Sequence, residues 1–210
     1  MGFTGSLILA RTPQPLTDLG LLTGLDGELV GRRADHWQLA VTDRAQGTPG
    51  WAAAFVDATA APVLIADVSD SDTALLVADS PGGHRWSALL NALVDSGPWA
   101  TTTPATACSD AVAAVAEVVV AWAAEAGQTV TAEAVTEALS VADRDNRAAD
   151  QAWRDAAGDV AAMTEIVRNQ VAFIEVYVLR VLAVLGLAVP VQDTSPWWAH
   201  LASQANTHSP

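Results

Sequence analysis

Residues 62–83 read PVLIADVSDSDTALLVADSPGG and carry the clearest structural signal in the chain. Two runs of strand-forming residues, 63–68 and 73–78, lie on either side of the pair Asp70 and Ser71. Aspartate and serine favour tight turns because their side chains hydrogen-bond to nearby backbone amides. Runs of this kind, separated by a short polar connection, are typical of a β-hairpin. The segment therefore predicts two antiparallel strands joined by a turn at Asp70 and Ser71.

The three aspartates of this segment have two interpretations. Alternation along the predicted strands sets Asp67 opposite Ala74, puts Asp72 on the same face as Asp67, and leaves Asp70 at the tip. Three neighbouring carboxylates could bind Mg²⁺ or Ca²⁺. However, no glycine marks a calcium loop and no histidine lies within ten residues. We interpret Asp67, Asp70 and Asp72 as the solvated end of a hairpin, with a metal or acid–base site as the alternative.

The rest of the first half also predicts short strands and one short helix. Residues 5–11 and 36–43 are predicted to be strands, and 84–93 is predicted to be either a further strand or a strand that turns into a helix. A helix is expected after Pro49 and before Pro62. Short strands joined by tight turns favour an antiparallel sheet. We therefore expect an α+β fold in which residues 1–97 form a mostly antiparallel sheet lobe.

Beyond a threonine- and proline-rich boundary at 96–107 the chain is predicted to be helical. Thr131 is placed to cap a helix, and Gly127 to end the preceding one. The expected elements are helices at 109–127 and 131–143, a charged and partly helical connector at 143–159, a long apolar helix at 159–187 and a tail at 191–210. Residues 108–190 would form a helical lobe that, with the sheet lobe and tail, makes one compact unit.

The long helix is predicted to lack a continuous polar face. A side that begins with polar residues near 165 continues onto Val176, Leu179 and Ala183. A helix that is apolar all round must be enclosed by the rest of the fold or by another subunit. A central core helix and a self-association surface that forms a homodimer are the two alternatives. Glu175 and Arg180 are expected at the rim of the packing, or paired.

Composition excludes several classes of partner. The chain has 24 acidic and 10 basic residues, a net charge of −14, and all its basic residues are arginine. A field of this sign repels nucleic acid and anionic membranes. The most apolar segment, 171–189, carries Glu175 and Arg180, which favours a buried helix over a membrane span. The single cysteine, Cys108, and the lack of a recognisable signal peptide predict a cytoplasmic protein.

Catalytic and cofactor signatures are missing from the sequence. Four histidines are scattered without ligand spacing, and Cys108 has no companion thiol, so we expect no metal and no cofactor. Tryptophan is abundant, with eight residues. Trp99, Trp197 and Trp198 fall in the boundary and the tail, where a large ring can anchor a protein interface. The alternative is that the tail folds back and covers the chain's own core.

Three segments give the chain a resemblance to known sequences. They are MGFTGSLILAR at 1–11, APVLIADVSDSD at 61–72 and LAVLGL at 182–187. Together with a helical second half, these segments resemble a group of uncharacterised actinobacterial proteins of unknown function. The resemblance covers most of the chain. It implies a bacterial cytoplasmic origin and supplies no catalytic residues.

These observations favour a non-enzymatic protein-interaction or regulatory module. Its expected contact residues are Trp99, Trp197, Trp198, Val176, Leu179 and Ala183. One alternative is an enzyme or small-ligand binder that uses Asp67, Asp70 and Asp72, together with Trp86 or His84. The other is an immunity-type or inhibitor protein whose negative surface covers a basic partner.

Overall fold

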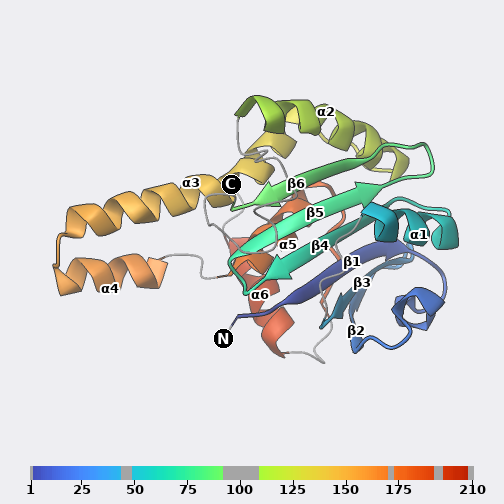
Figure 1. The fold of residues 1–210 in the computed structure, drawn as a ribbon, viewed down its shortest axis with the longest axis horizontal. Coiled ribbons are helices and arrows are strands. Elements are labelled where there is room, and N and C mark those ends of the chain that lie inside the picture. The colour runs from blue at the N-terminus through green and yellow to red at the C-terminus, as the bar shows by residue number, and fades with distance from the viewer. Residues whose placement is uncertain (1, 44–48, 92–108, 170–172, 192–195, 208–210) are drawn as a thin grey trace.

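The computed structural model describes residues 2–43, 49–91, 109–169, 173–191 and 196–207. It is an α+β fold built on one six-stranded antiparallel sheet (Figure 1). In sheet order the strands are β2 (Gly27–Arg32), β3 (Trp37–Thr42), β1 (Gly5–Arg11), β4 (Val63–Ser69), β5 (Thr73–Asp79) and β6 (Trp86–Leu90). The helices are α1 (Pro49–Thr59), α2 (Ser109–Glu125), α3 (Ala132–Ala156), α4 (Val160–Asn169), α5 (Ile174–Val184) and α6 (Pro196–Thr207).

Both faces of the sheet are covered by other elements. Side chains alternate between the two faces along each strand, and in the central strands both sets are mostly apolar and must be buried. On β1, Ile8 and Ala10 face a core that is closed by α1 and by the 3₁₀ segments η1 (Leu16–Asp18) and η2 (Gly20–Leu22). Leu7 and Leu9 face a larger core shared with α2, α3, α5 and α6.

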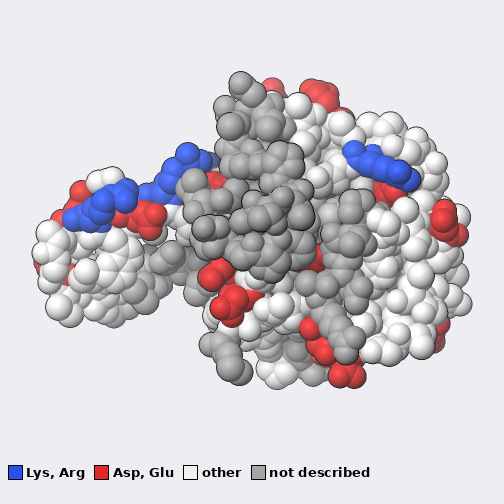
Figure 2. All heavy atoms as spheres, in the orientation of Figure 1, with Lys and Arg blue, Asp and Glu red and all other residues white. Residues whose placement is uncertain are grey.

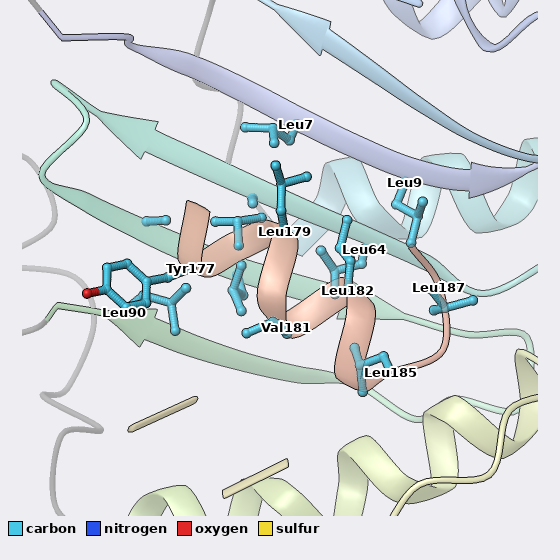
Figure 3. Packing of buried hydrophobic residues seen from close by; sticks show 14 of the residues in the cluster. Leu7, Leu9, Leu64, Leu90, Tyr177, Leu179, Val181, Leu182, Leu185 and Leu187 are labelled. Carbon is cyan, nitrogen blue, oxygen red and sulfur yellow. The ribbon is translucent and has the colours of Figure 1, made fainter. Parts of the chain in front are cut away.

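Helix α5 is the centre of the larger core. All nine residues from Ile174 to Leu182 are buried. Figure 3 shows the helix lying across the sheet, with Leu179 and Leu182 beside Leu7 and Leu64 of the strands. Full burial of each such leucine contributes roughly 1.5–3 kcal/mol. Within the described ranges, no helix has both the length and the hydropathy that a membrane span requires.

The predicted hairpin is present, with a register that differs by one residue. Asp70 and Ser71 both have positive φ, 49° and 58°, as in the type I′ turn that suits a hairpin. The backbone N–H of Asp72 donates to the carbonyl oxygen of Ser69 at 3.0 Å, but the residue that pairs with Ser69 in the sheet is Thr73. Asp72 is therefore an unpaired extra residue just before the second strand. It places Asp67 opposite Leu75 instead of the predicted Ala74.

Three predictions about other elements were wrong in detail. Strand β2 was not expected, because its glycines weaken the strand pattern. The connector at 143–159 was predicted to be partly helical, but it is helical as far as Ala156 and continuous with the preceding helix as α3. The single helix expected at 159–187 is not continuous, since Phe173 has extended backbone (φ −134°, ψ 128°) and α4 and α5 are separate helices.

Candidate functional site

The three aspartates of the hairpin do not share one environment. Asp67 is fully buried on the face that α1 covers, and its carboxylate accepts a hydrogen bond from Ser6 Oγ. Asp70 and Asp72 are exposed. The prediction that all three are solvated is therefore wrong for Asp67. In the part of the chain that the structure describes, no group of three His, Cys, Asp or Glu side chains is placed to hold a metal ion.

His84 and Trp86 lie away from these aspartates. They follow the far end of β5, whereas Asp70 and Asp72 precede its first residue. His84 Nε2 is 3.1 Å from a carboxylate oxygen of Glu125. Trp86 is buried and packs edge-on against Trp122, with 5.9 Å between ring centroids. The structure does not bring these residues together into the predicted alternative site.

The hairpin tip instead anchors other parts of the chain. Ser71 Oγ accepts from the backbone N–H of Phe3 at 2.7 Å and donates to Glu175 Oε1 at 2.7 Å. The backbone carbonyl of Ser71 accepts from the amide of Ile174 at 3.0 Å, at the start of α5. Glu175 is fully buried, and desolvation raises the pKa of its carboxyl group. We interpret this cluster as a structural connection between the N-terminus, the hairpin and α5.

The residues expected to contact a partner have different exposures. Trp99 lies outside the described residues. Val176 and Leu179 are buried in the core beneath α5. Ala183, at the end of α5, is exposed. Of the expected contact residues that α5 contributes, Ala183 therefore presents its side chain on the surface, and Val176 and Leu179 do not.

The two tryptophans of the tail also differ. Trp198 is buried and lies edge-on to Phe3, with 5.6 Å between ring centroids. Trp197 keeps 40% of its surface exposed and lies edge-on to Phe173 at 4.8 Å. Helix α6 therefore folds back on the core and leaves one indole ring accessible.

The most prominent surface feature is an arm formed by the second half of α3 and by α4 (Figure 1). Helix α3 is roughly 37 Å long. Its buried residues all precede residue 144, so the part of the helix after that residue extends away from the sheet. Ala157 and Gly158, with φ of 45° and 91°, reverse the chain. Asp159 then caps α4 by accepting from the amides of Ala161 and Ala162 at 2.9 and 3.2 Å.

A groove of about 950 Å³ lies where this arm meets the body. Ala148, Ala152 and Ala156 line it at four-residue intervals along α3. Their small side chains leave room for a neighbouring helix to pack a ridge of its own side chains into the row. The remaining lining residues come from α3, α4 and α5 and are Val141, Arg144, Asp145, Ala149, Asp155, Ala162, Glu165, Ile166, Tyr177 and Arg180.

Arg180 is the charged group that α5 contributes to the groove. Only 9% of its surface is exposed, and its guanidinium carbon lies 5.0 Å from the centre of the Tyr177 ring. Its Nε and Nη2 atoms have no hydrogen-bond partner among the described residues and are closed off from solvent. An unpaired charged donor of this kind costs free energy in the folded chain. Of the two alternatives expected for Arg180, pairing with an acid is not found among the described residues, and the residue instead lines the groove at the edge of the core.

A chain of polar contacts surrounds this arginine. Tyr177 donates its hydroxyl hydrogen to Asp145 Oδ2 at 3.0 Å, and Asp145 Oδ1 lies 3.8 Å from Arg144 Nε. Arg144 also pairs with Glu137. Burial raises the pKa of Tyr177, and the negative charge of Asp145 raises it further. The hydroxyl group therefore stays protonated as a donor to Asp145, and Asp145 is already engaged by partners other than Arg180.

The groove surface carries both signs of charge. Figure 2 shows arginine atoms next to acidic atoms along the projecting arm. Asp155, which lines the groove, accepts from Gln151 Nε2 at 2.9 Å. The site combines an alanine-rich wall, a buried unpaired guanidinium and several acids. It contains no arrangement of nucleophile and base among the described residues that line it.

Sequence reasoning did not find this groove. Tyr177 and Arg180 are three residues apart on α5 and therefore share a face, which is a local signal. Their partner Asp145 lies 32 residues earlier. Comparison with known protein families, curated proteins and solved structures found no match.

Proposed function

We propose that the chain is a non-enzymatic protein-interaction module whose binding site is the groove between α3, α4 and α5. The partner in this proposal is a helical segment of another protein. The observation that carries it is the row of Ala148, Ala152 and Ala156, which faces an open groove instead of the chain's own core. A helix packs into such a row more closely than it packs against large side chains.

Other features of the arm support a protein partner. Trp153 and Val160 are 36% and 75% exposed on α3 and α4. A two-helix arm buries little apolar surface by itself, and a third helix would cover what it leaves accessible. Binding of an amphipathic helix in a hydrophobic groove is a recurring mode of peptide recognition. A cytoplasmic location and a lack of nucleic-acid and membrane partners remain predictions from composition.

A site-specific photo-crosslinking residue at Ala148 tests the proposal. Ala148 is exposed and lines the groove, and the matched control is Ala113, which is exposed on α2. In cells of the source organism, we expect position 148 to yield an adduct whose peptide has apolar residues at intervals of three and four. Position 113 should not yield it. No adduct at 148, or the same adducts at both positions, would contradict a binding groove.

A further inference from the structure

The groove contains a buried arginine, Arg180, that has no ion-pair partner among the described residues. This feature indicates which chemical group a bound partner would carry. Arg180 is nine-tenths buried, and two of its guanidinium nitrogens lack an acceptor among the described residues. The Tyr177 ring lies 5.0 Å from the guanidinium carbon. A ring face attracts a cation but accepts none of the strong hydrogen bonds that its N–H groups can donate.

Two of the acids that line the groove with this arginine, Asp145 and Asp155, have other partners. Asp145 accepts from Tyr177 at 3.0 Å and lies 3.8 Å from Arg144. Asp155 accepts from Gln151. Neither carboxylate is hydrogen-bonded to Arg180. An acceptor that enters along the groove would provide the missing hydrogen bonds as the guanidinium turns toward it.

We propose that Arg180 recognises a carboxylate on the helical segment that binds in the groove. This inference rests on the proposed function and specifies the partner's chemistry. The guanidinium presents a planar set of donors that matches a carboxylate with two parallel hydrogen bonds. Asp145, Asp155 and Glu165 also line the groove, so an acceptor with one negative charge is repelled less than a doubly charged phosphate.

The expected partner segment is therefore an amphipathic helix with an acidic residue inside its apolar face. Its small or medium apolar side chains would pack against the alanine row of α3. Its Asp or Glu would reach Arg180 beside Tyr177. Because Nε and Nη2 of Arg180 are closed off from solvent, a carboxylate that displaces the groove's water and bonds to this guanidinium would form an ion pair with little contact with water. A charge-assisted hydrogen bond of this kind changes affinity by about 10- to 100-fold.

The test uses a displayed library of 16-residue helical peptides, selected for binding to the full chain. We expect the selected peptides to share one Asp or Glu, flanked by apolar residues three or four positions away. In the parent protein, replacing that acid by Asn or Gln should weaken binding about 10- to 100-fold. In Arg180→Met, the same replacement should change affinity by less than about twofold, since the interacting cation is gone.

Two double variants separate this inference from the proposed function. Ala148→Gln/Ala152→Gln fills the row with long neutral side chains, and Ala113→Gln/Ala124→Gln places the same side chains on exposed positions of α2. We expect only the first to abolish peptide binding. One contrary result is a set of selected peptides that lose binding in Ala148→Gln/Ala152→Gln and yet share no acidic residue. Another is a set that binds Arg180→Met as tightly as the parent. Either result would overturn the carboxylate proposal but not the binding groove.

Two outcomes would overturn the binding groove itself. One is a selection whose peptides bind equally well to both double variants, and the other is a selection that yields no binding peptide. Light scattering on the unmodified chain tests a second copy as the occupant. A dimer that Ala148→Gln/Ala152→Gln dissociates would assign the groove to self-association and would overturn the partner proposed above. A monomer supports an external partner.

Discussion

Replacing Arg180 by methionine should stabilise the folded chain. The substitution keeps an unbranched apolar side chain against α3 and removes two buried donors that have no acceptor among the described residues. Each buried unpaired donor costs about 1–3 kcal/mol, and a charged group costs more, so two donors of a guanidinium cost about 4 kcal/mol. Both Arg180 and Tyr177 are buried, so loss of their cation–π contact removes about 2 kcal/mol of stabilisation. The net expectation is an increase of about 2 kcal/mol in the free energy of unfolding.

Urea denaturation followed by tryptophan fluorescence would measure this change. In a chain of 210 residues, an increase of about 2 kcal/mol corresponds to a rise in Tm of about 4–8 °C. The control is Arg144→Met, which removes an exposed ion pair and should lower stability by no more than about 1 kcal/mol. A loss of more than about 1 kcal/mol in Arg180→Met would refute the reasoning, because it would mean that the folded chain already satisfies this guanidinium.

Three further predictions concern the groups that hold the fold together. Burial raises the pKa of Glu175, so the folded state binds its proton more tightly than the unfolded chain, whose carboxyl has a pKa of about 4.3. Glu175 therefore makes the folded chain less stable as the pH rises from about 4.3, the pKa of this carboxyl in the unfolded chain, to its higher pKa in the folded chain. In urea titrations, Glu175→Gln should be more stable than the parent at pH 7 but not below about pH 4. Thr131→Ala removes the cap of α3 and should lower the free energy of unfolding by about 0.5–2 kcal/mol, measured calorimetrically; an unchanged Tm would contradict the capping role. In Gly31→Ala the new Cβ would lie 2.5 Å from the carbonyl oxygen of Pro190, whereas Gly20→Ala meets nothing within 4 Å. Thermal unfolding should show a loss of about 1–3 kcal/mol for the first and little change for the second, and equal effects would contradict this packing.

The local signals of the sequence predicted most of the sheet. The hairpin turn at Asp70 and Ser71, the strand at 5–11 and the cap at Thr131 all depend on residues close together in sequence. The α+β class and the antiparallel pairing followed from these elements. Strand β2 was missed because its residues, GELVGR, include two glycines, and backbone pairing with β3 together with burial of Val30 outweighs this weak local preference.

The second half was harder because its helices have different surroundings. The charged residues after 143 were interpreted as a partly helical connector, but they form the outer half of the continuous helix α3, which extends into solvent. The apolar residues after 173 belong to α5, which is enclosed by the sheet and by α3 and α6. A single periodic pattern was extended across two helices with different roles, so the break at Phe173 was not predicted.

The environments of Asp67 and Arg180 depend on contacts between distant segments. Strand alternation placed Asp67 on one face of the sheet but could not indicate that α1 covers that face. Arg180 was recognised as a charge within an apolar helix, and its neighbour Tyr177 is visible in the sequence. Asp145, which engages Tyr177, and the alanine row come from α3, so the groove follows only from how α3 packs against α5.

An unpaired cation that lowers the stability of the free chain gives the groove a specific chemical preference. Buried polar groups in folded proteins are normally hydrogen-bonded, and exceptions are expected at functional sites such as those that bind a ligand or another protein. The same guanidinium that destabilises the free chain would be satisfied by the carboxylate of a bound segment. Stability of the free chain and affinity for an acidic helix should therefore change in opposite directions in Arg180→Met.

Nuclear magnetic resonance of the Arg180 side chain tests this account most directly. With ¹⁵N-labelled protein, addition of a selected acidic peptide should move the Arg180 Nε–H proton resonance downfield and slow its exchange with water. The matched peptide with Gln in place of Glu should leave that resonance close to its position in the free chain. An Arg180 signal that is unchanged by the acidic peptide, while resonances from the rest of the groove shift, would contradict recognition of a carboxylate by this arginine.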